Sequence, residues 1–96
     1  MNRGITKNTH PGEILKEEVI KAHNLTIIKA AELLKVSRST LSNIINGRSP
    51  ITPNIAIRIA TVFGGNAELW IRLQATYELR ETEKMFTAKP IDLQKS

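Results

Sequence analysis

Apolar side chains recur along most of the chain at intervals of three and four residues, the spacing that gives a helix one buried face. Five segments show this spacing, and proline, glycine or asparagine residues separate them. The pattern predicts helices from Pro11 to about Asn24, from Ile27 to Leu34, from Arg38 to about Asn46, from Pro53 to Phe63 and from Ala67 to about Lys84. No segment gives comparable support for a strand.

Polar residues that accept hydrogen bonds from the first amides of a helix stand before these segments. Thr26, Ser37, Thr52 and Asn66 are the predicted N-caps, and Thr9 or His10 caps the first helix. The predicted core is the apolar face of each helix: Ile14, Leu15, Val19 and Ala22; Ala30, Ala31 and Leu34; Leu41, Ile44 and Ile45; Ile55, Ile59, Val62 and Phe63; Leu69, Trp70, Leu73 and Tyr77.

The length and composition describe one small globular domain. The chain has 96 residues, of which 41% are apolar and 24% charged, enough for a single core and too few for two. We therefore expect an all-α domain over residues 9–86, preceded by an N-terminal arm, residues 1–8. The loss of helical periodicity around Pro90 predicts a mobile tail, residues 87–96.

The charge distribution narrows the choice of partner. Lys and Arg number 14 against 9 Asp and Glu, a net charge of +5, which suits nucleic acid, an anionic membrane surface or an acidic protein. Residues 33–67 contain no acidic side chain but include Lys35, Arg38, Arg48 and Arg58. The absence of cysteine, of a secretory signal and of a membrane-spanning apolar run predicts a cytoplasmic protein without a membrane partner.

The second and third predicted helices form a candidate helix-turn-helix over about residues 27–46. A turn of three or four residues joins them, and the third helix is polar on its exposed side. Ala31, five residues before Val36, is small enough to let the helices approach. The side chains that fill the wedge between the helices are Leu34, Val36, Leu41 and Ile44. An ordinary helical hairpin with a polar exterior is the alternative.

Motifs spread over residues 9–83 add a family resemblance. They are His10-Pro11-Gly12-Glu13, then Val36-Ser37-Arg38-Ser39-Thr40-Leu41-Ser42, Asn46-Gly47-Arg48, Ile51-Thr52-Pro53 with Arg58-Ile59-Ala60, and Glu68-Leu69-Trp70 with Leu73-Gln74 and Tyr77. The sequence resembles the HigA-type (VapI-like) antitoxins, a branch of the phage-repressor-like (XRE) helix-turn-helix regulators. The resemblance implies a five-helix, lambda-repressor-like domain that forms a homodimer and binds double-stranded operator DNA upstream of its own operon. It also implies a protein partner, a HigB-like toxin that cleaves messenger RNA on the ribosome.

Three positions depart from the family pattern. Lys35 stands where the turn usually has glycine, so we expect a non-glycine residue at positive φ, at a cost of roughly 1 to 2 kcal/mol. Ile27 replaces a glutamine that bonds a DNA phosphate in many relatives, so that contact is expected to be missing. Ala67 replaces a common proline, which the Asn66 cap should tolerate.

The start of the third helix carries the expected DNA contacts, because repressors of this fold insert that end into the major groove. Arg38 and Asn43 can bond guanine and adenine edges, and Ser39 can bond several bases. The expected phosphate contacts lie at the helix start and the following loop: Ser37, Thr40, Ser42, Asn46 and Arg48.

Several residues of the chain have a structural explanation that does not require DNA or a dimer. Ser37 caps a helix whether or not DNA binds, and Arg58 reads as a solvated charge. Trp70, Leu73 and Tyr77 form either core or a twofold interface.

The sequence gives little support for an enzyme, a metal site or a cofactor. It has no cysteine, two distant histidines and one aspartate, Asp92, so no nucleophile and base or metal-ligand spacing is present. Two alternatives to the antitoxin keep the fold. One is a free-standing or phage-type regulator without a toxin, and the other is a module that mainly masks a basic toxin through Glu13, Glu17 and Glu18, with secondary DNA binding.

Overall fold

The structure is a computed structural model, and it describes residues 8–86. The expected tail, and the expected arm apart from Asn8, lie outside these residues. The described elements are α1 (Pro11–Ile14), η1 (Leu15–Ile20), α2 (Ile27–Leu34), α3 (Arg38–Ile45), α4 (Pro53–Phe63) and α5 (Ala67–Met85). None of the described residues forms a strand, so the all-α prediction is confirmed.

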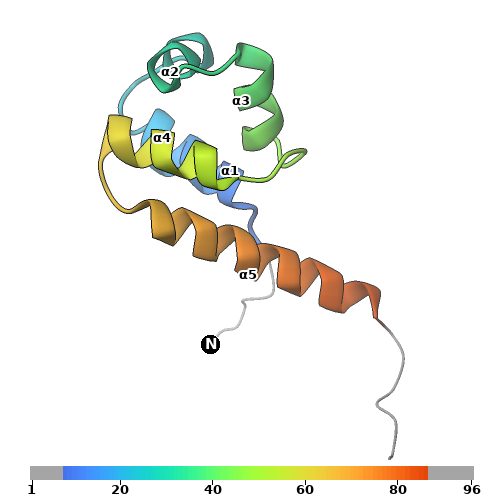
Figure 1. Cartoon of the computed structure of the whole chain (residues 1–96). Coiled ribbons are helices and arrows are strands. Elements are labelled where there is room, and N and C mark those ends of the chain that lie inside the picture. The colour runs from blue at the N-terminus through green and yellow to red at the C-terminus, as the bar shows by residue number, and fades with distance from the viewer. Residues whose placement is uncertain (1–7, 87–96) are drawn as a thin grey trace, which may run out of the picture.

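The helices are arranged in tiers (Figure 1). α2 and α3 pack together at one end, α1 and α4 lie in the middle, and α5 runs along the opposite side. The C-terminal half of α5 extends beyond the other helices. The helix-turn-helix is therefore separated from α5 by the middle tier.

The predicted N-caps are confirmed. Thr26, Ser37, Thr52 and Asn66 each accept a hydrogen bond from an amide in the first turn of the following helix, at 2.7 to 3.3 Å. His10 caps α1, because its Nδ1 accepts the Gly12 N–H at 2.8 Å. Each cap satisfies an amide that helix geometry leaves without a partner.

The prediction of one regular α-helix from Pro11 that buries Ala22 is wrong. After α1 the chain widens into the π-helix η1, and the Lys21 N–H bonds the carbonyl five residues back, on Lys16, at 2.9 Å. An α-helix would turn Leu15 and Ile20 to different faces, whereas the wider turn aligns them. Both are therefore buried, and Ala22 is exposed.

The core lies between the helix-turn-helix and α5. Its largest fully buried side chains are Leu15, Leu34, Leu41, Ile44, Ile51, Ile59 and Pro11. Two predicted core positions are wrong, because Val62 is 38% and Leu69 52% exposed. The buried face of α5 includes Gln74 instead, whose amide oxygen accepts the Ile51 N–H at 2.8 Å while its nitrogen donates to Glu78 at 3.0 Å. These hydrogen bonds allow the polar side chain of Gln74 to be buried on α5, whereas the predicted core residue Leu69 is exposed.

The turn between α2 and α3 has the conformation expected from the sequence. Lys35 lies in the left-handed region with φ 59°. Its N–H and that of Val36 bond carbonyls in the last turn of α2, those of Glu32 and Ala31. This compact turn places Ser37 at the start of α3.

Candidate nucleic-acid interface

Ser37 and Thr40 organise the N-terminal end of α3. The Ser37 hydroxyl accepts the Thr40 N–H at 2.9 Å and donates to the Thr40 hydroxyl oxygen at 2.7 Å. The Thr40 hydroxyl hydrogen is left free to donate outward. Both side chains are exposed, so this end of α3 offers polar groups beside the positive end of the helix dipole, a favourable place for a phosphate.

Arg38 and Ser39 lie in the first turn of α3 and are exposed. Neither side chain forms a hydrogen bond or an ion pair with any residue from 8 to 86. Their donors and acceptors are consequently available to an external partner. A guanidinium can bond guanine O6 and N7 together, and a hydroxyl can bond several base edges.

Asn43 and Arg48 lie together, although the sequence predicted different DNA contacts for them. Arg48 Nη1 donates to Asn43 Oδ1 at 3.3 Å, and the Arg48 N–H donates to the Asn43 carbonyl at 2.8 Å. The first bond points the amide oxygen of Asn43 toward Arg48. The amide nitrogen then remains a donor for an acceptor such as adenine N7.

Ser42 and Asn46 form the other pair, at the C-terminal end of α3. Asn46 Nδ2 donates to the Ser42 carbonyl at 2.8 Å and to the Ser42 hydroxyl at 3.3 Å. The Asn46 N–H also donates to the Ser42 carbonyl, at 3.1 Å, so the side chain adds a second hydrogen bond to this carbonyl at the end of α3. The predicted DNA contacts thus lie on α3, on its N-cap Ser37 and on the loop that follows it.

The charge around α3 is positive. Lys35, Arg38 and Arg48 are exposed, and none forms an ion pair with an acidic side chain of the described chain. Their charges are not neutralised locally, so they favour a polyanion such as the DNA backbone.

Arg58 is not the solvated charge that the sequence suggested. Its Nη1 donates to the carbonyls of Leu34 and Lys35 at 3.1 and 3.3 Å, and its Nε donates to Asn54 Oδ1 at 2.7 Å. The side chain is half-buried between α4 and the end of α2. Helical periodicity could not show this, because the two carbonyls lie more than twenty residues away along the chain.

Comparisons with known proteins agree with this geometry. A helix-turn-helix family model matches residues 15–70. Virulence-associated protein I of Dichelobacter nodosus is 39% identical over 75 residues, 78% of this chain and 69% of that protein. Antitoxin HigA-1 of Vibrio cholerae is 35% identical over 75 residues, 78% of this chain and 70% of that protein. The chain belongs to the helix-turn-helix family, in its HigA-type (VapI-like) branch.

A solved structure extends the comparison to the whole HigA-type fold. The Pseudomonas aeruginosa antitoxin HigA with the higBA promoter superposes with a TM-score of 0.81 at 30% identity, over 91% of this chain and 99% of that one. Membership of this family places the chain among DNA-binding regulators and not among enzymes. Within residues 8–86 no helix has the length and apolar character needed to cross a membrane.

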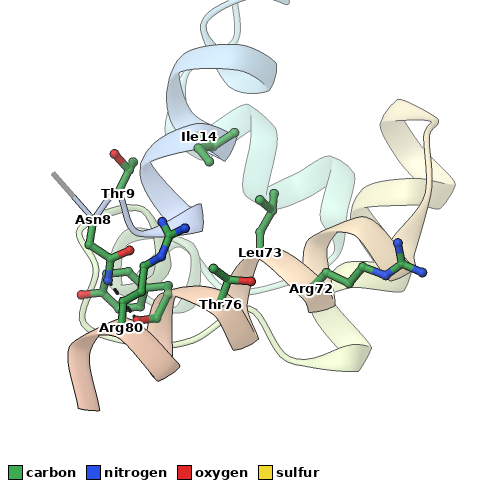
Figure 2. A pocket seen from close by; sticks show the side chains of 8 residues that line it. Asn8, Thr9, Ile14, Arg72, Leu73, Thr76 and Arg80 are labelled. Atoms are coloured by element: carbon green, nitrogen blue, oxygen red, sulfur yellow. Dashed lines mark hydrogen bonds between the residues drawn. The ribbon is translucent and has the colours of Figure 1, made fainter. Parts of the chain in front are cut away.

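The residues predicted as a HigA-type dimer interface divide into two groups. Trp70 belongs to the core, with 7% exposure. Leu73 and Tyr77 are half-buried and, with Ile14 and Thr76, line a groove of about 350 Å³ between α1 and α5 (Figure 2). Tyr77 also contacts the His10 ring edge-on, with centroids 4.7 Å apart. An interface through Leu73 and Tyr77 stays a prediction.

The other side of α5 carries apolar residues that sequence reasoning missed. Ala75 and Leu79 on α5 and Phe86, the extended residue directly after the helix, are exposed, and with Thr82 they follow one another at intervals of four, three and four residues. This spacing is the one by which two helices pack along a shared seam. The interval itself was the available signal, but the stronger aromatic pattern at Trp70 and Tyr77 obscured it.

Proposed function

We propose that this chain is a sequence-specific DNA-binding antitoxin that represses its own operon. The observation that carries the proposal is the pair of side chains Arg38 and Ser39, which are exposed and without partners among the described residues, at the start of a capped helix in a sequence segment without acidic residues. The solved structure of Pseudomonas aeruginosa antitoxin HigA is one with the higBA promoter. This similarity supports a promoter as the ligand of this surface.

The contacts divide between reading and anchoring. Arg38, Ser39 and Asn43 read base edges in the major groove, where each good bidentate pair gives about 1 to 3 kcal/mol of discrimination. Ser37, Thr40, Ser42, Asn46 and Arg48 anchor the protein to phosphates. Lys35 adds charge without a specific contact.

The proposed binding unit is a homodimer joined through α5. The exposed seam of Ala75, Leu79, Thr82 and Phe86 supports this arrangement, since Leu79 is 60% and Phe86 75% exposed in the single chain. Solvated apolar side chains on one face favour a partner. Twofold symmetry then requires recognition helices about 34 Å apart, one DNA turn.

The proposal includes neutralisation of a HigB-like toxin, which rests on the family. In this proposal the acidic face of α1 and η1 contacts such a basic protein. Glu13, Glu17 and Glu18 are exposed there, and Glu17 pairs with Lys21 at 3.2 Å. Co-expression of this chain with a toxin gene from the same operon should restore growth. If the acidic face contacts the toxin, reversing the charge of Glu18 should weaken this rescue and leave DNA binding unchanged.

The deciding experiment is fluorescence anisotropy of the full chain on DNA from upstream of its gene. Scrambled DNA of equal length is the control, over a salt series of about 50 to 200 mM. We expect at least about a thousandfold preference for the upstream DNA, as for a specific repressor. Equal binding to both, lost as salt rises, would show that the basic surface is only electrostatic.

A further inference from the structure

Arg58 connects α4 to the turn of the helix-turn-helix. One guanidinium nitrogen donates to both the Leu34 and Lys35 carbonyls, and Nε donates to Asn54 on the same helix as Arg58. The Asn54 bond, at 2.7 Å, fixes the direction of the planar guanidinium. Arg58 is thus held at its base and extends toward the turn.

The turn needs these donors. A helix leaves its last carbonyls without partners, and the N–H groups of Lys35 and Val36 return to carbonyls earlier in α2. Arg58 supplies the donors for two later carbonyls, those of Leu34 and Lys35. It does so where Lys35 holds a left-handed backbone without the freedom of glycine.

The turn is also what sets the direction of α3. Only Lys35 and Val36 separate the last residue of α2 from Ser37, the cap of α3. A small change in the backbone at Lys35 therefore shifts the whole N-terminal end of α3. Base contacts require accurate placement, whereas phosphate contacts by flexible cations tolerate more movement.

We propose that Arg58 is a positioning residue for sequence reading: from α4 it holds the α2–α3 turn in the shape that directs Arg38 and Ser39 toward the bases. This role rests on the DNA binding proposed above. It makes α4, which carries none of the expected base contacts, a determinant of specificity. Arg58 acts through Leu34 and Lys35 and does not itself touch DNA.

The test compares promoter and scrambled DNA for the full-length chain with Arg58→Met, which keeps most of the stem and removes the donors. Lys84→Met is the control for loss of a positive charge, because Lys84 is exposed in the last turn of α5, on the side of the helix away from the seam, and pairs with Glu81 at 2.9 Å. Both variants are measured at a temperature where circular dichroism shows the native helix content. Arg58→Lys keeps the charge and can still donate to a carbonyl.

We expect Arg58→Met to reduce the promoter-to-scrambled affinity ratio by about tenfold or more, the discrimination of one good base contact. Affinity for scrambled DNA should fall no more than in Lys84→Met. Arg58→Lys should recover part of the ratio. In hydrogen exchange, the Lys35 and Val36 amides should exchange faster in Arg58→Met than in wild type.

Equal losses on both DNAs, with a salt slope flattened by about 0.9, would identify Arg58 as a direct phosphate contact and overturn the proposal. An unchanged ratio would overturn it as well. If Arg58→Met does not fold, Asn54→Ala replaces it, since that variant removes only the bond that orients the guanidinium, and the same ratio decides. Failure of the proposed function is separate, because the wild-type titration itself would then show no promoter preference.

Discussion

Arg38 is an exposed cation at the start of α3 with no hydrogen bond or ion pair to any residue of the described chain. A charged side chain contributes little to stability in such a position. Its guanidinium is therefore free for bidentate recognition, and replacing it should affect binding without affecting folding.

We expect Arg38→Ala to weaken binding to the promoter by about 1 to 3 kcal/mol and to relax the base preference at one position of each half-site. The melting temperature should stay within about a degree of wild type, as for an exposed substitution. Anisotropy on a set of single-base operator variants measures both effects. A uniform loss on every sequence would assign Arg38 to a phosphate.

His10 is the residue whose protonation should affect the fold. Burial lowers the pKa of its imidazole, and the Glu78 carboxylate partly opposes this. The cap on Gly12 also requires an unprotonated Nδ1. Because the folded pKa lies below the unfolded value, the unfolded chain binds the proton more readily, and stability is lost as pH falls from about 6.5 through the folded pKa.

Urea unfolding between about pH 7.5 and pH 5 should show this loss. His10→Asn is the control, since an asparagine oxygen can accept the Gly12 N–H at any of these pH values. Its unfolding free energy should depend less on pH than that of wild type. Identical pH profiles would exclude His10 as the titrating group.

Sequence reasoning succeeded where a residue acts on its immediate neighbours. Ser37 caps α3 through an amide three residues away, and Lys35 adopts positive φ because its place in the turn demands it. Arg58 and Gln74 were missed because their partners lie far along the chain. Only the folded arrangement of α2, α4 and α5 brings those groups together.

At the scale of elements, α1 and α3 meet without a side chain between them. Gly12 is buried, and a Cβ at this position would overlap the carbonyl of Ile44. The carbonyl belongs to the backbone of α3, so it cannot move aside alone. The motif residue Gly12 thus sets the distance between the first helix and the recognition helix.

Gly12→Ala should lower the free energy of unfolding by about 1 to 3 kcal/mol, the usual cost of overpacking. The reason is that α1 must move away from α3. Thermal denaturation measures the loss. Gly65→Ala is the comparison for backbone strain without a steric clash, because no atom lies within 4 Å of the added Cβ but φ is 96°. A normal melting temperature for Gly12→Ala would contradict the close approach.

Element boundaries were more predictable than the faces that elements bury. The bounds of α2 and the starts of α4 and α5 follow from Thr26, Thr52 and Asn66, whose effects are local. The π-helix was missed because a period of 3.6 residues was assumed throughout. Leu69 was assigned to the core because it is apolar and next to Trp70, whereas α5 turns Trp70 and Gln74 inward and leaves Leu69 exposed.

At the scale of the whole molecule, the two ends of the tiers have different chemistry. The exposed side of α3 is basic and polar. α5 runs along the opposite side of the molecule (Figure 1) and exposes the apolar seam. Pairing through α5 would leave both recognition helices accessible. In the proposed dimer, pairing and DNA binding would therefore use different surfaces.

We expect Leu79→Glu to shift the protein from dimer to monomer in sedimentation velocity, because a carboxylate would be buried in the seam. Promoter affinity should fall by about a hundredfold or more, as the second half-site becomes a separate binding event. Leu69→Glu is the control, since Leu69 is also exposed on α5 but lies off the seam. A wild-type monomer, or a dimeric Leu79→Glu variant, would rule out this interface.

The π-helix η1 contains one residue more than a regular helix would need between Leu15 and Ile20. Deleting a residue usually destroys the packing of a helix, because every side chain after the deletion rotates by about 100° around the helix axis. Here the loss of exposed Glu18 would bring Ile20 to the ordinary α-helical interval from Leu15. The chain should therefore tolerate a shortened η1, while the same deletion at exposed Ile57 in α4 should abolish folding.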